Sequence, residues 1–172
     1  MFHIIALGEV LIDFTPRGVS ENSNALFERN LGGAPCNVLA TMSEFGCKTG
    51  FIGKVRADDF RCFLRDVTVQ NRINIDNLYV TDKYPTILAI VHLNEQGDRS
   101  FSFYRNNSVD VMLDVNDIDA SSIANSQIFH LGSLLLTGNL ARDTTLKTLD
   151  IAKEKNVVIS YDPNLGPPLW IV

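Results

Sequence analysis

The chain has 172 residues, a hydrophobic fraction of 45% and a net charge of −5. This length suffices for one domain with a sizeable core, and scattered Lys and Arg residues without any apolar run of roughly 20 residues argue against a nucleic-acid surface, a membrane surface or a membrane span. Three cysteines without a CxxC pair argue against a disulfide framework or a zinc site, so we expect a reducing, cytoplasmic setting.

Strands and helices are predicted to alternate in the first part of the chain. Pro35 near the start of one apolar-periodic segment, with Gly46 just past its end, is typical of a helix. The predicted order is a strand over 4–14, an extended stretch around Phe27, a helix over 35–45, a strand over 49–53 and an amphipathic helix over 59–70.

Short β-rich runs replace this rhythm in the middle of the chain, at 78–80, 86–93 and 100–104. A polar loop that contains Gly97 joins the last two runs, as in a β-hairpin. The segment 100–103 alternates strictly between polar and apolar residues, which indicates a half-buried strand. These runs predict a small separate sheet that stands off the main one.

The α/β rhythm returns with a predicted strand over 128–131, a helix over 141–155 and a strand over 157–161. Strands that alternate with helices predict βαβ units and a parallel sheet. Residues 157–161 are apolar on both faces, which is typical of an interior strand, and we expect the 172-residue chain to leave an edge of this strand and an apolar face open to water.

Asp13 is the first candidate site residue. It follows an apolar run that is predicted to be a strand, and open α/β sheets bind ligands outside the carboxyl ends of their strands. A carboxylate there can accept strong hydrogen bonds from two neighbouring sugar hydroxyls. The alternative is an acid that caps a loop.

The second candidate is the pair Gly32 and Gly33 with Asn37 in the following helical turn. Paired glycines let the backbone approach a ligand closely, the helix N-terminus offers N–H groups, and the Asn37 amide can both donate to and accept from a hydroxyl. A plain Gly-Gly turn before a helix is the alternative. Neither a Walker A loop nor a G-x-G-x-x-G motif is present.

Two further candidates lie at predicted strand ends. Tyr104 and Arg105 end a predicted lid strand and could cover a sugar, although residue type alone favours a surface hairpin with one buried aromatic face. Asp162 and Asn164 flank a proline, where they can either face a ligand or bond their own backbone in a turn. His130 lies in a buried-looking strand and is interpreted as a core residue.

Together these segments resemble the PfkB (ribokinase-like) carbohydrate kinase family, and the fructokinases above all. The resemblance rests on the order and spacing of the following segments: Ala6-Leu7-Gly8-Glu9 through Asp13-Phe14, Gly32-Gly33-Ala34-Pro35 with Asn37-Val38, Phe51-Ile52-Gly53-Lys54-Val55, Arg99-Ser100-Phe101-Ser102-Phe103-Tyr104-Arg105, and Asp162-Pro163-Asn164 with Pro167-Pro168-Leu169-Trp170.

The resemblance implies a ribokinase-like three-layer α/β sandwich with a mostly parallel central sheet and a small β lid near 15–30 and 78–105. It implies transfer of the ATP γ-phosphate to a sugar hydroxyl with Mg²⁺. Because exposed strand edges invite pairing, we also expect the lid to join two copies in a homodimer. Fructose is the first choice of sugar and 2-keto-3-deoxygluconate, whose carboxylate would suit Arg105, the second. It further implies sugar-binding roles for the following residues: Asp13, Gly32, Gly33, Asn37, Tyr104, Arg105, Asp162 and Asn164.

The chain also departs from this family. Gly166 stands where such kinases usually have an arginine, and Arg56 and Arg61 stand where they have glycines. The Gly-Ala-Gly-Asp segment with the catalytic base, the nucleotide pocket and the Asn-x-x-Glu motif do not occur in these 172 residues. We therefore expect an N-terminal, substrate-binding part of a kinase, poorly stable and inactive alone. A non-catalytic sugar-binding or regulatory module and an unrelated α/β interaction domain are the alternatives.

Overall fold

The computed structural model describes residues 1–94 and 96–164. Its main element is a five-stranded sheet with the order β5-β4-β1-β8-β9, in which every neighbouring pair is parallel. The predicted α/β class with a parallel central sheet is confirmed. The strands are β1 (Phe2–Leu7), β4 (Thr49–Arg56), β5 (Ile73–Thr81), β8 (Ser126–Gly132) and β9 (Val158–Asp162).

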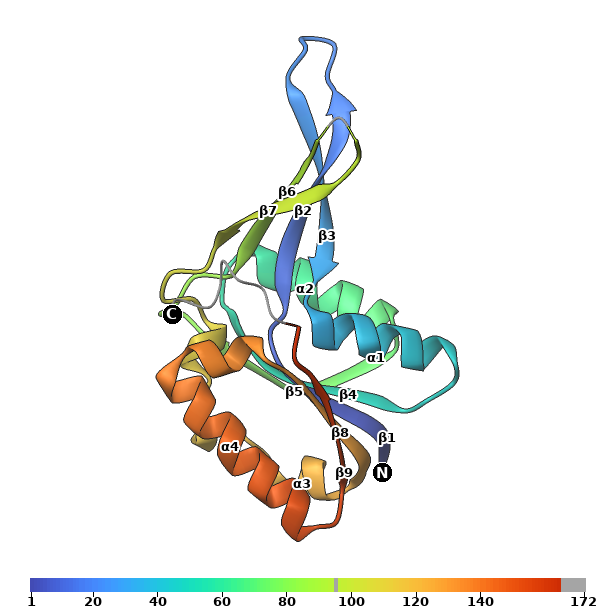
Figure 1. Ribbon diagram of the computed structural model, residues 1–172, viewed down its shortest axis with the longest axis vertical. Coiled ribbons are helices and arrows are strands. Elements are labelled where there is room, and N and C mark those ends of the chain that lie inside the picture. The colour runs from blue at the N-terminus through green and yellow to red at the C-terminus, as the bar shows by residue number, and fades with distance from the viewer. Residues whose placement is uncertain (95, 165–172) are drawn as a thin grey trace.

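Helices cover both faces of this sheet, and the side chains of β1 alternate between the two cores that lie there. Ile4 and Ala6 are buried in one core with Leu39, whereas Ile5 and Leu7 are buried in the other. No helix in the described ranges is long and apolar enough to span a membrane. On one face lie α1 (Ala34–Glu44) and α2 (Asp59–Gln70), and on the other α3 (Ala120–Ala124) and α4 (Asn139–Glu154) (Figure 1).

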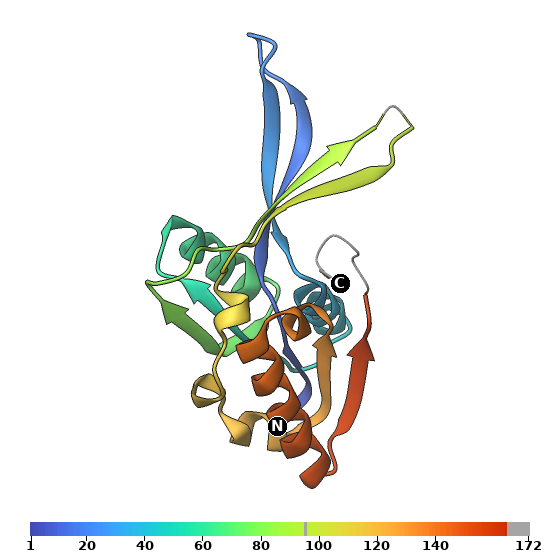
Figure 2. The ribbon, with the colours of Figure 1, turned by 60° about the vertical axis from the view of Figure 1, so that its left-hand side comes forward.

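A second, four-stranded sheet rises from one end of the main sheet, with the order β3-β2-β6-β7. It consists of two antiparallel hairpins joined by a parallel pairing of β2 with β6. Figure 2 shows the two hairpins spreading apart as they leave the main body. The strands are β2 (Leu11–Val19), β3 (Ala25–Gly32), β6 (Leu88–Leu93) and β7 (Arg99–Tyr104).

One boundary of the expected lid is wrong. Residues 78–80 do not leave the main sheet, because they lie in β5, which pairs in parallel with β4. β5 is the edge strand, and it buries Ile73 and Asn77 while residues such as Asp76 and Val80 stay exposed. Its polar composition therefore resembles that of a lid strand.

The predicted single strand over 4–14 is also wrong, because the chain changes sheets within it. β1 ends at Leu7, residues 8–10 cross over, and β2 starts at Leu11. Gly8 makes the crossing compact, since a Cβ atom there would collide with the side chain of Pro35. Burial continues through Val10 and Leu11, which is why hydrophobicity alone does not reveal the break.

Within the described residues β9 lies at the other edge of the main sheet, with an edge and apolar side chains left open as expected. It pairs with β8 alone, and Val158, Ile159 and Tyr161 are 62%, 36% and 50% exposed. The apolar composition of β9 thus belongs to a strand whose outer side is uncovered.

The turn between β4 and α2 forms without the two glycines that Arg56 and Arg61 replace. Asp58 is the N-cap of α2, and its Oδ1 accepts hydrogen bonds from the backbone N–H groups of Phe60 and Arg61. Its Oδ2 accepts a third hydrogen bond from the hydroxyl of Thr86, at 2.8 Å, just before β6. One carboxylate therefore stabilises both a helix of the main body and the root of the second sheet.

We expect Asp58→Ala to lower the free energy of unfolding by about 1–2 kcal/mol, because three donors lose their acceptor. Urea unfolding monitored by circular dichroism measures the change. The matched control is Asp59→Ala, which removes an exposed acid from the first turn of the same helix. Equal effects of the two substitutions would contradict the dual role of Asp58.

Candidate functional site

A cavity of about 550 Å³ lies between the second sheet and the carboxyl ends of the main-sheet strands. Its size falls within the usual range for a small-molecule site, and its place is the one where open α/β sheets bind ligands. Three structural units contribute walls: the segments after β8 and β9, the N-terminus of α1, and strands β2 and β7.

The main-sheet wall follows the ends of two neighbouring strands. Gly132 ends β8, and Ser133 and Leu134 come directly after it. Asn164 lies beyond β9, where its carbonyl accepts a hydrogen bond from the Ser133 hydroxyl at 3.3 Å. This contact joins the two loops into one wall.

The N-terminus of α1 forms a second wall with Gly33, Ala34 and Asn37. Gly33 has φ = 115°, a conformation that side-chain-bearing residues rarely adopt, and a Cβ atom there would lie 2.5 Å from the carbonyl oxygen of Glu9. Glycine is therefore required on two counts, and the backbone of this turn faces the cavity unobstructed. The following turn carries Asn37, whose exposed amide side chain can both donate and accept.

The second sheet supplies the remaining wall. Leu11 and Asp13 come from β2, and Phe101 and Phe103 come from β7. The two phenyl rings are stacked with centroids 5.7 Å apart, because residues two apart on a strand share a face. Asp13 is partly buried, which raises the pKa of its carboxyl. This wall therefore places one carboxyl beside an aromatic surface.

Glu9 also lines the cavity, and we did not single it out from the sequence. Its Oε1 accepts a hydrogen bond of 3.1 Å from the backbone N–H of Ala34 in the first turn of α1. Its Oε2 is buried and has no partner among the described residues. The side chain is 5% exposed, and burial raises the pKa of Glu9 to about 7 against the lowering effect of its backbone hydrogen bonds. The carboxyl thus titrates near neutral pH.

The break between β1 and β2 explains why Glu9 was overlooked. Within an unbroken strand it would be one polar residue in an apolar run, but it lies at the crossing between the sheets. The only available sign was a carboxyl inside an otherwise apolar segment, four residues before Asp13.

Of the eight sequence-predicted site residues, four line the cavity: Asp13, Gly33, Asn37 and Asn164. Gly32 lies behind it and leaves space for Asp13, whose carboxyl a Cβ atom at that position would meet. Asp162 accepts a hydrogen bond at 3.0 Å from the backbone N–H of Asn164, which is the turn geometry that we considered as the alternative.

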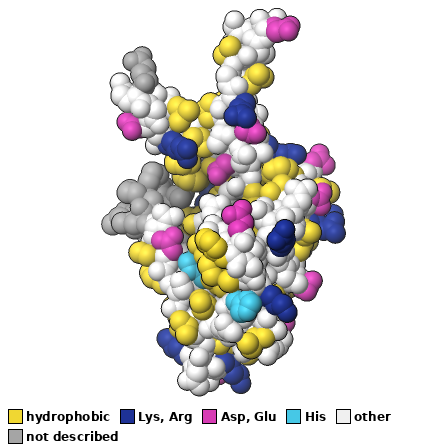
Figure 3. Space-filling view, turned by 90° about the vertical axis from the view of Figure 1, so that its right-hand side faces the viewer, with side chains coloured by type: hydrophobic (Ala, Val, Ile, Leu, Met, Phe, Trp, Pro, Cys, Tyr) yellow, Lys and Arg dark blue, Asp and Glu magenta, His cyan; other side chains and the backbone are white. Residues whose placement is uncertain are grey.

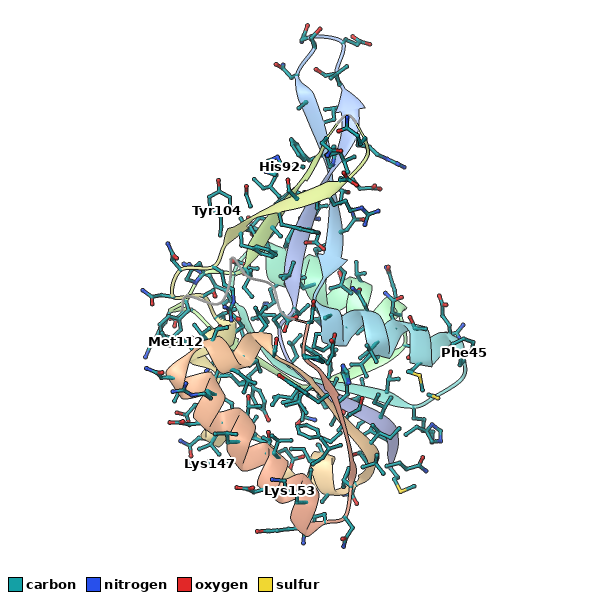
Figure 4. The ribbon with its side chains drawn as sticks, in the orientation of Figure 1. Phe45, His92, Tyr104, Met112, Lys147 and Lys153 are labelled. Atoms are coloured by element: carbon teal, nitrogen blue, oxygen red, sulfur yellow. The ribbon has the colours of Figure 1, made fainter. Side chains whose placement is uncertain are left out.

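The structure does not bring Tyr104 and Arg105 to the cavity wall. Tyr104 is 61% exposed and projects outward from β7 (Figure 4). Arg105 is buried in an ion pair with Asp110. Gly166 and Pro167-Pro168-Leu169-Trp170, which also entered the sequence prediction, lie outside the described residues.

His130 of β8 lies in the main sheet near this end of the structure. Its Nδ1 is 3.0 Å from the hydroxyl of Ser160, and its Nε2 is buried without a partner among the described residues. Burial lowers the pKa of His130, and the charge of Asp162 opposes that effect. The ring is therefore a half-satisfied core residue outside the cavity lining.

Comparisons with known proteins agree with this architecture. The model of the pfkB family carbohydrate kinases matches residues 1–171. The chain belongs to this family. Its relatives include a probable chloroplastic fructokinase-6 of Arabidopsis thaliana, 38% identical over 98% of the chain and 44% of the relative, and a fructokinase of Solanum tuberosum, 38% identical over 97% and 53%.

Solved structures of the family superpose closely on the chain. A fructokinase from Xylella fastidiosa has a TM-score of 0.92 at 31% identity, over 99% of this chain and 53% of that one. Another structure of that enzyme, with bound ATP, has a TM-score of 0.91. These matches confirm the predicted ribokinase-like fold, and the chain spans about half the length of the relatives that it matches.

The described residues do not fit the magnesium and nucleotide that this family implies. They contain no group of three or more His, Cys, Asp or Glu residues that could hold a metal ion. The cavity lining as described has no Lys or Arg to face a phosphate, and the N–H of Ala34 at the start of α1 already donates to Glu9. Such an arrangement suits hydroxyl groups better than phosphates.

The buried carboxyl of Glu9 predicts a pH-dependent stability. Its pKa is about 7 in the folded protein, above the 4.5 of an exposed glutamate, so its contribution to stability is fully present below pH 4.5 and is lost as the pH rises through 7. We expect Glu9→Gln to remove about 3 kcal/mol of this pH dependence.

Urea unfolding of the unsubstituted protein and of Glu9→Gln from pH 4.5 to 8 measures the difference between their free energies of unfolding. The titrations of Asp13 and His130 are common to the two proteins and cancel in this difference. Glu44→Gln, at the exposed end of α1, is the matched control and should run parallel to the unsubstituted protein. Parallel curves for Glu9→Gln as well would show that the carboxyl does not titrate in this range.

Proposed function

We propose that the chain is the sugar-binding part of an ATP-dependent sugar kinase, with fructose as the acceptor. The observation that carries the proposal is the cavity itself, which brings together Asp13, Asn37, the turn at Gly33 and two stacked phenyl rings. The relatives named as fructokinases favour fructose among the sugars.

The residues of the cavity can divide the recognition of a sugar between them. Asp13 accepts hydrogen bonds from two neighbouring hydroxyls, and the Asn37 amide donates to one hydroxyl while accepting from another. Phe101 and Phe103 cover an apolar face of the ring and keep water from it. Because phosphoryl transfer depends on positioning, holding the acceptor hydroxyl in one place is the contribution of these residues.

The proposal makes Asp13 the main sugar anchor. In the protein as its gene encodes it, we expect Asp13→Ala to raise the KM for fructose about ten- to hundredfold or to abolish turnover, since a charge-assisted hydrogen bond contributes about 1.5–3 kcal/mol. Steady-state kinetics at saturating ATP measure the change. Glu21→Ala, at the exposed tip of the β2–β3 hairpin, is the control. Unchanged fructose kinetics in Asp13→Ala would refute the anchor.

We also propose that residues 1–172 do not transfer phosphate by themselves and that two copies pair through the second sheet. The 172 residues lack the Gly-Ala-Gly-Asp and Asn-x-x-Glu segments. Apolar side chains are exposed on the β2–β3 hairpin at Val19, Leu26 and Phe27, and open strand edges invite pairing. Purified residues 1–172 should show no ATP-dependent phosphorylation of fructose and should sediment as a dimer or larger. An active monomer would contradict both proposals.

A further inference from the structure

Arg105 is held by four hydrogen bonds directly behind the cavity wall. Its Nε and Nη2 donate to Oδ2 of Asp110 at 2.8 and 2.6 Å, its Nη1 donates to the hydroxyl of Thr137 at 2.7 Å, and its Nη2 also donates to the carbonyl of Leu134 at 3.0 Å. The Arg105 side chain is 9% exposed and that of Asp110 is 1% exposed. These four bonds, two of which share Oδ2 of Asp110, fix the guanidinium in one orientation.

Neighbouring groups hold Asp110 in turn. The Ser108 hydroxyl, which is fully buried, donates to Oδ1 of Asp110, and the backbone N–H of Val109 donates to the carbonyl of Pro85 before β6. Arg105 directly follows β7, so the network lies at the root of the strand that carries the two phenyl rings. The position of the arginine is therefore set by the fold.

The cavity has the opposite charge character. Glu9 and Asp13 are its only ionisable lining residues in the part of the chain that the structure describes. Leu134 separates this cavity from the arginine, because it lines the cavity and its carbonyl accepts from the guanidinium. Figure 3 shows that Lys and Arg side chains are dispersed among acidic ones on the face it presents, without forming a basic patch.

The charges of the pair reach the cavity and oppose each other there. Beyond burial and the backbone hydrogen bonds, the charge of Asp110 raises the pKa of Glu9 and the charge of Arg105 lowers it. Because the ion pair of Arg105 and Asp110 has no net charge, a ligand in the cavity meets a neutral pair behind the wall. Without the negative charge of Asp110, the positive charge of Arg105 would act on the ligand across Leu134. Coulomb interactions are weakly screened in such a buried place.

We propose that Asp110 is a positioning residue for specificity: it holds and neutralises Arg105 behind Leu134, so that the cavity selects neutral sugars over sugar acids. This inference rests on the proposed sugar-binding function and adds the class of sugar. It also assigns Arg105 a role other than the direct sugar contact that the sequence resemblance implied.

The test compares dissociation constants of fructose and 2-keto-3-deoxygluconate by titration calorimetry at pH 7, on the protein as its gene encodes it. The unsubstituted protein binds fructose more tightly. Asp110→Asn keeps the shape of the side chain but leaves Arg105 charged, and shifts the ratio of the two constants about tenfold toward the acid. The double substitution Arg105→Gln with Asp110→Asn removes both charges and restores the original ratio.

Two further variants separate charge from folding. Ser108→Ala removes one hydrogen bond to Asp110 but neither charge, so it lowers the melting temperature without moving the ratio. Arg105→Gln leaves Asp110 unpaired and shifts the ratio further toward fructose, which provides a measurement even where Asp110→Asn does not fold. Raising the salt concentration reduces both shifts.

The outcomes distinguish the inference from the function on which it rests. If the unsubstituted protein binds neither sugar, the proposed function is wrong and the inference falls with it. If it binds fructose but the single substitutions weaken both ligands by the same factor, the pair is only structural and the inference alone is wrong. Tighter binding of the acid by the unsubstituted protein would also overturn it.

Discussion

The hydrogen bond from the Ala34 backbone to the Glu9 carboxyl joins the three parts that make the cavity. The N-cap residue of α1 is Gly33, which has no side chain to cap the helix, so a carboxyl from another segment takes that place. Glu9 can do so because the chain leaves the main sheet there and enters the second one. The contact therefore fixes the sheet crossing, the helix N-terminus and the turn at Gly33 together, and it requires a buried acid.

The second sheet, which supplies another wall of the cavity, is held at its base by two further groups. Asp58 stabilises the entry to β6 through Thr86, and Arg105 with Asp110 fixes the exit of β7. Asp58 also caps α2, and Arg105 also donates to Thr137 and Leu134, so both anchors bond the main body of the protein. The hairpins themselves extend away from these anchors (Figure 2).

Much of the architecture could be predicted from the sequence because its signals are local. The helix over Asp59–Gln70 was predicted with its observed bounds, and the alternation of strands and helices gave the parallel sheet. The sheet change at residues 8–10 and the membership of β5 could not be predicted, because both depend on which segment covers a strand. Neither the strand propensity of a residue nor its polarity indicates which segment will cover the strand.

The candidate site shows the same division. Asp13, Gly33 and Asn37 stand out by residue type and spacing, and all three line the cavity. Arg105 also stood out, but its charge is taken up by Asp110, only five residues further along the chain. Glu9 was not singled out, since a buried carboxyl is recognised by its surroundings and not by its neighbours in sequence.

The parallel pairing of β2 with β6 sets an order for assembly. Each hairpin closes a short loop and can form from local contacts, whereas residues 12–14 meet residues 88–90 only after the intervening helices and strands have brought them together. The seam between the hairpins therefore closes late in folding. Because Asp13 and the phenyl rings lie on opposite sides of that seam, a molecule that binds both would hold the two hairpins together.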